Sequence, residues 1–249
     1  MLDVPFTGEA KSIARQRYEE AQQRREREAT TPDDYARRAQ ACVGVGTFAL
    51  VFDGFEQAQD AFGDAADDYT ESVETRIADP AGTDYAAIPL HAWRGAYAAL
   101  LAGDRGRARA LADAVAMAEQ SPEPGVRLDD HPFHYARAVA AAAAGDDEAA
   151  RETLAGTDPN NEWAEATTTA LRGAIEGDRA AFEPALNELL EAAHERAEQG
   201  SEMDVRSMVF AAEPTALTLI AWDRGMGYDP DSRLVPSGFL WKTLPKLRD

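Results

Sequence analysis

The chain has 249 residues, and its 45 acidic residues outnumber 25 basic ones, which gives a formal net charge of −20 at pH 7. Hydrophobic residues make up 45% of the sequence, enough to build a core, and this excludes a wholly disordered chain. The strong negative charge repels phosphate backbones, so we expect no nucleic-acid partner.

The residues behind this charge indicate adaptation to concentrated salt. Only three lysines stand beside 22 arginines, alanine supplies 51 residues, and isoleucine supplies five. At about 1 M ionic strength the screening length falls to about 3 Å, so that many like charges no longer oppose folding. This composition resembles that of halophilic archaeal proteins. The alternative is an acidic face that mimics nucleic acid or docks onto a basic partner.

Three features bear on the compartment and on covalent chemistry. Cys42 is the only cysteine, so neither an intramolecular disulfide nor a cysteine-rich zinc site is expected. The longest apolar run, Ala138–Ala144, is far shorter than the ~20 residues of a membrane span. The first ten residues have neither the basic start nor the apolar stretch of a signal peptide. We therefore expect a cytoplasmic protein with no membrane partner.

Helical spacing runs through nearly every long segment, and no alternating pattern typical of a strand is present. The first predicted helix is highly charged and should form a solvated arm or cap. Thr31 and Pro32 then mark a helix start, because a hydroxyl caps the helix and proline is favoured in its first turn. The predicted helices span about residues 11–28, 32–52, 55–77, 88–102, 105–119, 134–144, 147–154, 163–176, 179–199 and 214–222, with a short segment at 239–241.

Three of the predicted turns contain the dipeptide Gly-Asp, at residues 103–104, 145–146 and 177–178. Glycine can take the left-handed conformation that ends a helix, and aspartate can cap the helix that follows. Longer loops are predicted at residues 79–82 and 121–125, where proline and glycine gather.

Four turns, at Asp53, Gly103, Gly145 and Gly177, have residues of similar size at the same distances along the chain. Small residues stand seven positions before each turn, namely Gly46, Ala96, Ala138 and Ala170. Five positions after the turns the residues are again small, except for Phe182, and nine positions after they are mostly larger, as at Phe62, Leu154 and Leu186. The pattern resembles the tetratricopeptide repeat, although the turns lie 50, 42 and 32 residues apart, against about 34 in the regular repeat.

We predict an all-α fold, a right-handed solenoid of antiparallel helical hairpins that is tetratricopeptide-like but degenerate, with about 10–12 helices. Residues 1–30 would form the charged arm. Residues 31–249 would form one helical-repeat domain, and its C-terminal segment 207–249 would cap the exposed end of the solenoid. An ordinary irregular helical domain is the alternative.

No motif predicts catalysis. His131 and His134 are three residues apart and could share a metal with Asp129 or Asp130, but Pro132 predicts that His131 precedes a helix whose first turn holds His134. The glycines of Gly44-Val45-Gly46 lie in the middle of a predicted helix and lack the lysine of a phosphate-binding loop. We therefore expect a protein that is not an enzyme and needs no cofactor or metal.

Aromatic and arginine side chains are the better functional candidates. Two consecutive hairpins begin with helices that contain Trp93-Arg94-x-x-Tyr97 and Phe133-His134-Tyr135-x-Arg137. In tetratricopeptide-like solenoids such helices line the concave surface, where Trp, Tyr and Arg commonly anchor partners. The alternative is that Trp93 and Tyr97, four residues apart on one stripe, fill the core between hairpins. Our partner-binding candidates here are Arg94, Tyr97, His134 and Arg137.

The C-terminal fifth of the chain contains a segment, residues 207–222, with far fewer charged residues than the rest of the sequence. Pro214 is predicted to start a buried apolar helix there. The run Leu217–Ala221, the triplet Asp223-Arg224-Gly225 and the loop from Asp231-Ser232 to Pro236 resemble the immunity protein 49 family. That resemblance implies a cytoplasmic antidote that binds and blocks the cognate toxin of a polymorphic toxin system, without catalytic residues. Arg224 of the triplet joins the partner-binding candidates.

The leading hypothesis is therefore a non-catalytic immunity protein whose partner is a protein, possibly a toxin domain. The alternatives are a general tetratricopeptide-like adaptor in a halophilic archaeon and a metal-dependent enzyme that uses His131 and His134. The sequence leaves open whether the protein is a monomer or a dimer.

Overall fold

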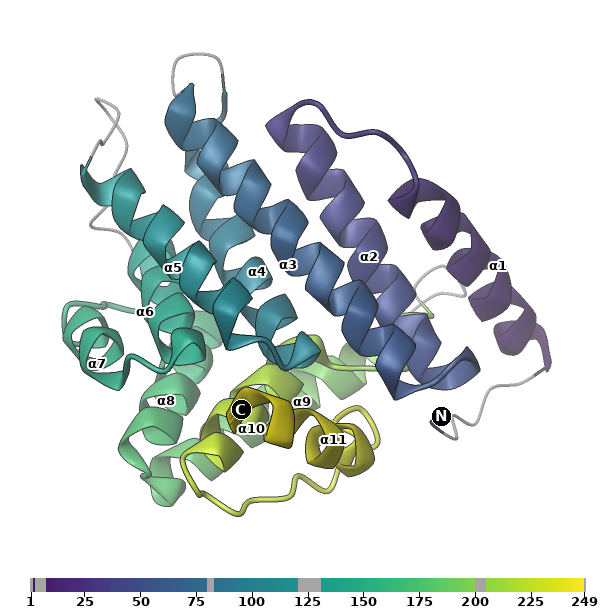
Figure 1. Ribbon diagram of the computed structural model, residues 1–249. Coiled ribbons are helices and arrows are strands. Elements are labelled where there is room, and N and C mark those ends of the chain that lie inside the picture. Colours follow the sequence, from purple (N-terminus) through teal and green to yellow (C-terminus); the bar gives the residue numbers. More distant parts are fainter. Residues whose placement is uncertain (1, 3–7, 80–82, 121–130, 200–204, 249) are drawn as a thin grey trace.

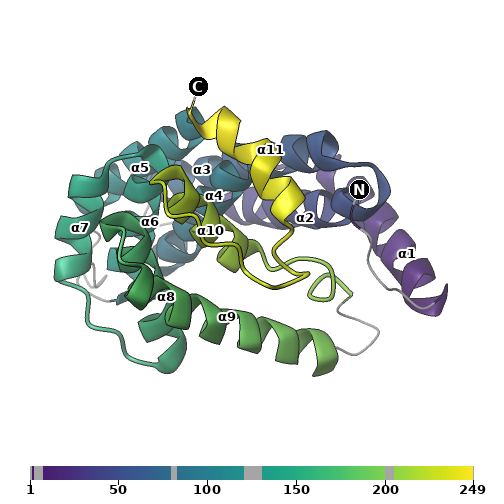
Figure 2. The same ribbon diagram turned by 90° about the horizontal axis from the view of Figure 1, so that it is seen from below.

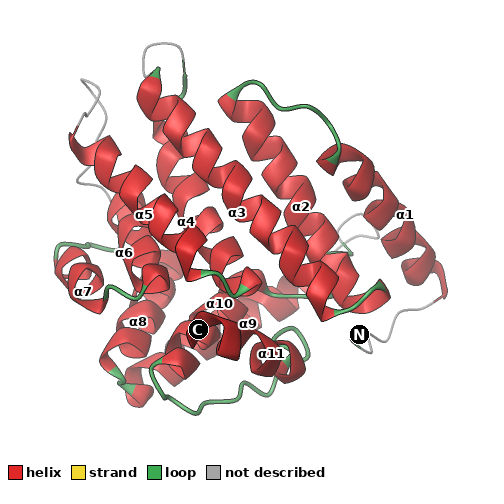
Figure 3. Cartoon of the chain, in the orientation of Figure 1, coloured by secondary structure: helices red, strands yellow, loops and turns green. Residues whose placement is uncertain are grey.

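The computed structural model describes residues 2, 8–79, 83–120, 131–199 and 205–248. In these residues the fold is all α, with eleven α-helices, one 3-10 turn and no strand, as predicted (Figures 1 and 3). The predicted loop at 121–125, most of the loop at 79–82, and most of the first seven residues lie outside the described residues. None of the described helices combines the length and the apolar character needed to cross a membrane.

The helices follow the predicted boundaries closely. They are α1 (Gly8–Arg25), α2 (Pro32–Phe52), α3 (Phe55–Ala78), α4 (Ile88–Ala102), α5 (Arg105–Gln120), α6 (His131–Ala144), α7 (Asp147–Ala155), α8 (Glu162–Glu176), α9 (Arg179–Gln199), α10 (Ala212–Asp223) and α11 (Ser237–Arg248), and the 3-10 turn η2 (Tyr85–Ala87) precedes α4. The prediction that His131 lies before its helix was wrong. The helix α6 already starts at His131, because proline at the second position of a helix needs no hydrogen-bond acceptor.

The capping chemistry read from the sequence is present. The Oγ1 atom of Thr31 accepts a hydrogen bond from the backbone N–H of Asp34 at 3.2 Å, and Pro32 opens α2. The glycines of the three Gly-Asp turns have φ angles of 76°, 88° and 70°. Each following aspartate accepts a backbone N–H of the next helix, for example Asp146 from Ala149 at 3.1 Å. Each of these turns therefore ends one helix and starts the next.

Consecutive helices pack against each other and follow an arc. In Figure 1, α1, α2 and α3 run side by side across the upper right, and α5 continues the row. The chain then turns through α6 and α7 into the pair α8 and α9, which closes the lower side. Seen from below in Figure 2, α8 and α9 lie opposite α2, α3 and α4. Whether this path is a degenerate right-handed solenoid remains a prediction.

The apolar helix α10 lies inside this arc (Figure 2). It contacts α4, α8, α9 and α11, and every residue from Pro214 to Trp222 is buried. A helix that is apolar on all sides is stable only when other elements surround it. The helices α4, α8, α9 and α11 therefore supply the surroundings that this apolar helix needs.

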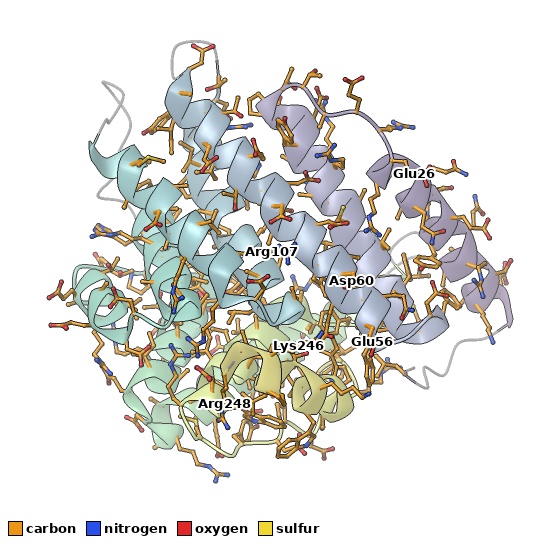
Figure 4. The ribbon with its side chains drawn as sticks, viewed as in Figure 1. Glu26, Glu56, Asp60, Arg107, Lys246 and Arg248 are labelled. Atoms are coloured by element: carbon orange, nitrogen blue, oxygen red, sulfur yellow. The ribbon has the colours of Figure 1, made fainter. Side chains whose placement is uncertain are left out.

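The last helix, α11, fastens the end of the chain to the N-terminal half. It is longer than the predicted segment 239–241 and contacts α3, α4 and α10. The Nε2 atom of Gln59 on α3 donates to the Oγ1 atom of Thr243 at 2.9 Å, and the Nζ atom of Lys246 donates to the Oε1 atom of Gln59 at 2.8 Å. Figure 4 places Lys246 beside the lower end of α3. These bonds join residues more than 180 positions apart in the chain.

The charged first helix α1 packs against α2 and contributes Ala14, Tyr18 and Ala21 to the main core. The hydroxyl of Tyr18 hydrogen-bonds to Asp53 at the end of α2. The remainder of its surface is strongly charged, as the sequence indicates. The assignment of residues 1–30 as a separate arm remains a prediction.

Candidate functional site

A cavity of about 550 Å³ lies inside the arc. Its walls come from α2, α3, α4, α8, α9 and the start of α10, together with the turn at residues 205–211 that leads into α10. We refer to it as the inner cavity. Because it collects residues from most of the chain at one concave place, it is the strongest candidate for a binding site in the described residues.

Three aromatic rings from three helices meet beside the inner cavity. Trp93 on α4 and Trp163 on α8 both line it, and their ring centroids are 5.8 Å apart. The ring of Tyr135 on α6 lies behind them, 6.0 Å from Trp93 and 6.1 Å from Trp163, both at steep angles. The ring of His131 stacks on that of Tyr135, with centroids 5.8 Å apart. These edge-to-face contacts hold the rings rigidly and fix the shape of the wall.

The carboxylate of Glu213 ties this aromatic wall to α10. Its Oε1 atom accepts a hydrogen bond from the hydroxyl of Tyr97 at 3.1 Å, and its Oε2 atom accepts one from the Nε1 atom of Trp163 at 3.2 Å. The Tyr97 hydroxyl also pairs with the hydroxyl of Tyr135. Glu213 lies in the first turn of α10, where the helix dipole favours a negative charge. The network therefore joins α4, α6 and α8 to the start of α10.

Burial determines the protonation tendencies in this network. It raises the pKa of Glu213, while the hydrogen bonds from Trp163 and Tyr97 and the charges of Arg196 and Arg94 act in the opposite direction. The pKa of Tyr97 is raised well above its ordinary value by burial and by the neighbouring Tyr135 and Glu213. Burial also raises the pKa of Tyr135 well above its ordinary value. The hydroxyls of Tyr97 and Tyr135 therefore remain protonated at neutral pH and can donate hydrogen bonds.

Three arginines surround the opening of the inner cavity from different elements. Arg94 comes from α4, Arg196 from α9 and Arg206 from the turn before α10. All three are exposed, and none forms an ion pair with another described residue. The opening thus combines aromatic faces with unpaired positive charge, the combination of side chains that is enriched at the energetic centres of protein interfaces.

Two of the five partner-binding candidates, Arg94 and Tyr97, lie in the inner cavity. Arg94 is exposed at its opening. Tyr97 is only 5% exposed, and its hydroxyl is occupied by Tyr135 and Glu213, so it contributes to the wall and belongs to the core as well.

The other three candidates lie elsewhere. His134 and Arg137 are partly buried on α6 and do not line the inner cavity, and the Nδ1 atom of His134 is buried without a hydrogen-bond partner. Arg224 follows α10, where its guanidinium donates to the carboxylate of Asp147 and to the carbonyl of Ala142. It therefore fastens α10 to the turn between α6 and α7. None of these placements tests partner binding, and all five assignments remain predictions.

The sequence reasoning missed Glu213, Trp163, Arg196 and Arg206. One signal was available for Glu213, because it is the only acidic residue between positions 205 and 222, in the least charged part of the chain. A single acid in an apolar helix needs hydrogen-bond donors from its surroundings. For the two arginines no signal exists, since nothing in their local sequence distinguishes them from the other twenty.

The two histidines of the metal hypothesis have different surroundings. The Nε2 atom of His131 lies 3.0 Å from the Oγ1 atom of Thr168 on α8, in a buried hydrogen bond. Asp129 and Asp130 lie outside the described residues. Among the residues that the structure describes, no three His, Cys, Asp or Glu side chains gather as a metal site would require.

A comparison with known protein families matches residues 10–239 to the family described as immunity protein 49. The match covers α2 to α10 completely and most of α1. Neither a curated protein nor a solved structure matches the chain.

Proposed function

The chain belongs to the immunity protein 49 family, and from this membership we propose that it binds and neutralises a cognate toxin of a polymorphic toxin system. The observation that carries the proposal is the extent of the match, which takes in nearly the whole chain and with it the walls of the inner cavity. The protein would act in the cytoplasm and by occupying the toxin, not by changing it chemically.

The concave site supports a protein partner. Trp93, Tyr97 and Trp163 offer large, rigid rings, and Arg94 offers a fork of donors beside them. Such side chains supply most of the binding energy in protein interfaces, because their burial is large and their ordering costs little. We propose Arg94 and Tyr97 as contact residues at this site, while His134, Arg137 and Arg224 would contribute through α6 and the end of α10.

A protection assay tests the function directly. A toxin-like domain from a reading frame adjacent to an immunity protein 49 gene, this chain's own where it has one, is expressed in a sensitive host, alone and together with this chain. We expect growth to be restored and the two proteins to purify as one complex. An unrelated acidic helical protein of similar size, expressed at the same level, is the control. No protection and no complex would refute the proposal, and a stable complex with a protein that is not a toxin would favour the adaptor alternative.

A titration separates occlusion from catalysis. Purified toxin is mixed with increasing amounts of this chain, and the remaining toxin activity is measured. Occlusion predicts a linear loss of activity that reaches zero at a stoichiometric ratio and does not change with time. Progressive loss at a small fraction of an equivalent would show instead that the chain acts as an enzyme on the toxin.

A further inference from the structure

A second cavity, of about 690 Å³, adjoins the inner one. It lies between α1 and α2 and is bounded on one side by Val205 and Arg206 of the turn before α10; we refer to it as the outer cavity. Gln40 and Arg206 line both cavities, so the two share a border along one side of α2. We refer to the two neighbouring cavities together as the hollow.

The charge of the hollow is opposite to that of the chain. Its lining contains eight of the 22 arginines but only four of the 45 acidic residues, Glu20, Glu28, Asp34 and Glu213. The chain as a whole has an excess of twenty negative charges. A local excess of arginine on so acidic a molecule creates a positive potential at one place only.

Some arginines of the hollow already form ion pairs with acidic residues of the chain, and others do not. Arg38 donates from its Nε and Nη2 atoms to both oxygens of Asp68 at 2.8 and 2.6 Å, and Arg17 pairs with Glu20 at 2.9 Å. In contrast, Arg94, Arg196 and Arg206 are exposed and have no ion pair with any described residue. Arg27, which lines the outer cavity, shares both properties. The three that line the inner cavity, Arg94, Arg196 and Arg206, are therefore available to an external anion beside its aromatic wall.

We propose that the hollow docks an acidic segment of a protein partner, whose aspartate or glutamate carboxylates pair with Arg94, Arg196 and Arg206. Carboxylates match the planar fork of a guanidinium, which can donate two parallel hydrogen bonds. This inference rests on the proposed function and names the chemistry by which the toxin is recognised.

The lining favours a protein segment over a phosphate chain. Trp93 and Trp163, both half-buried, also line the inner cavity, and they offer contact to the apolar residues that accompany acidic ones in a protein segment. A nucleic acid would bring a long row of charges toward a molecule with a net charge of −20, and most of that row would meet acidic surface. Pairing inside a partly enclosed hollow is also screened less by salt than pairing on an open surface.

The test compares charge-reversal variants. One carries Arg94→Glu, Arg196→Glu and Arg206→Glu together. The control carries Arg109→Glu, an arginine of α5 that is also exposed, has no ion pair with a described residue and lines neither cavity. The charges of Arg94 and Arg196 act on Glu213, so circular dichroism and the unfolding midpoint verify that the triple variant folds. Arg206→Glu alone, which reverses one charge as Arg109→Glu does, is the second test variant and should also bind the probe more weakly than the Arg109 variant.

The probe is a fluorescein-labelled peptide in which glutamates alternate with leucines, titrated at about 0.15 M salt and followed by fluorescence anisotropy. We expect the wild type and the Arg109 variant to bind it, and the triple variant to bind at least about tenfold more weakly. Absence of binding, or equal binding by the wild type and all variants, would overturn the proposal. Stronger binding of an oligothymidylate of the same length would assign the hollow to phosphate instead, and a wild-type dimer that the triple variant lacks would assign it to a second copy; either result would overturn the proposal.

The protection assay separates this inference from the function. If the wild type protects against the toxin and the triple variant protects equally well, the function holds and the hollow is not the docking surface. If the peptide binds as expected but no protection is found, the hollow recognises acidic segments and the proposed toxin function is wrong.

Discussion

At the scale of single residues, Glu213 shows how one buried acid can organise several helices. Its two oxygens accept hydrogen bonds from Tyr97 and Trp163, which belong to α4 and α8. Without this acceptor the indole N–H of the half-buried Trp163 and the hydroxyl of the buried Tyr97 would each lose a hydrogen bond, and a buried polar group that loses its partner costs about 1–3 kcal/mol.

Replacing Glu213 by alanine should therefore lower the free energy of unfolding by about 2 kcal/mol. Urea unfolding at neutral pH measures this. Glu213→Gln, which retains one acceptor oxygen, should lose less. Glu191→Ala, at an exposed position of α9, is the matched control and should stay within about 0.5 kcal/mol of the wild type. Equal losses for Glu213→Ala and the control would contradict the role assigned to this carboxylate.

His91 gives the chain a pH dependence of known sign. It is buried against Ser72, with its Nδ1 atom 3.0 Å from the serine Oγ, and burial, followed by the charge of Arg76, lowers its pKa from 6.5 to about 4. The folded protein therefore keeps this ring neutral while the unfolded chain protonates it. The contribution of His91 to the free energy of unfolding is therefore fully present above pH 6.5 and is lost as the pH falls toward 4.

The stability difference between the wild type and His91→Asn should consequently change between pH 7 and pH 4. The wild type should lose on the order of 3 kcal/mol more than the variant over this range, because one pKa unit corresponds to about 1.4 kcal/mol. Urea unfolding at several pH values measures the difference, and His194→Gln controls for the loss of a histidine elsewhere. Parallel pH profiles for wild type and His91→Asn would refute this prediction.

At the scale of helices, the register read from the sequence explains one close contact. Gly46 on α2 stands seven positions before a turn and Phe62 on α3 stands nine positions after it. A Cβ atom added at Gly46 would lie 2.8 Å from the Phe62 ring, which is fully buried. The glycine thus allows the two helices to approach, as the small-residue pattern predicts, although the wider repeat arrangement stays a prediction.

Gly46→Ala should therefore destabilise the protein by about 1–3 kcal/mol, since the fixed ring leaves no room for a methyl group. Gly63→Ala on α3 is the matched control. There the added Cβ would meet only the guanidinium of Arg107, the far end of a long side chain. Its hydrogen bonds to Asp67 and Asp104 would have to readjust, but the better helix propensity of alanine offsets part of this cost, so Gly63→Ala should destabilise less than Gly46→Ala. Thermal unfolding compares the two, and similar destabilisation by both changes would argue against the contact.

Most helices could be predicted from the sequence, because their ends are marked by local chemistry. The Gly-Asp turns and the Thr31 cap depend on residues within a few positions, and the structure confirms them. The inner cavity could not be predicted in the same way. Arg196 and Arg206 reach it only because α9 and the turn before α10 return to α4, and that return depends on packing between distant segments.

At the scale of the whole molecule, the net charge of −20 opposes compactness at low salt. Exposed acids even neighbour one another along single helices, as do Glu56 and Asp60, four residues apart on α3 and labelled in Figure 4. Like charges at this spacing repel each other by a few tenths of a kcal/mol. The repulsion between these exposed charges becomes weaker when salt shortens the screening length.

Stability should therefore rise as KCl is increased from about 0.05 M to 1 M, where the screening length falls to about 3 Å. The double variant Glu56→Gln and Asp60→Asn should be more stable than the wild type at low salt and should depend less on KCl. Urea unfolding at fixed pH measures both effects, and sucrose at equal osmolality controls for exclusion of the solute. A stability that falls with KCl would contradict the composition-based expectation of salt adaptation.

The position of α10 inside the arc has a consequence for biosynthesis. The walls of the inner cavity include Gln40 near one end of the chain and Glu213 near the other, so a ribosome must translate past α10 before those walls can close. A stalled or prematurely terminated chain would contain most of the helices and still lack the cavity. If the chain binds its partner through this cavity, only chains that have been translated beyond α10 can bind, and shorter nascent chains cannot.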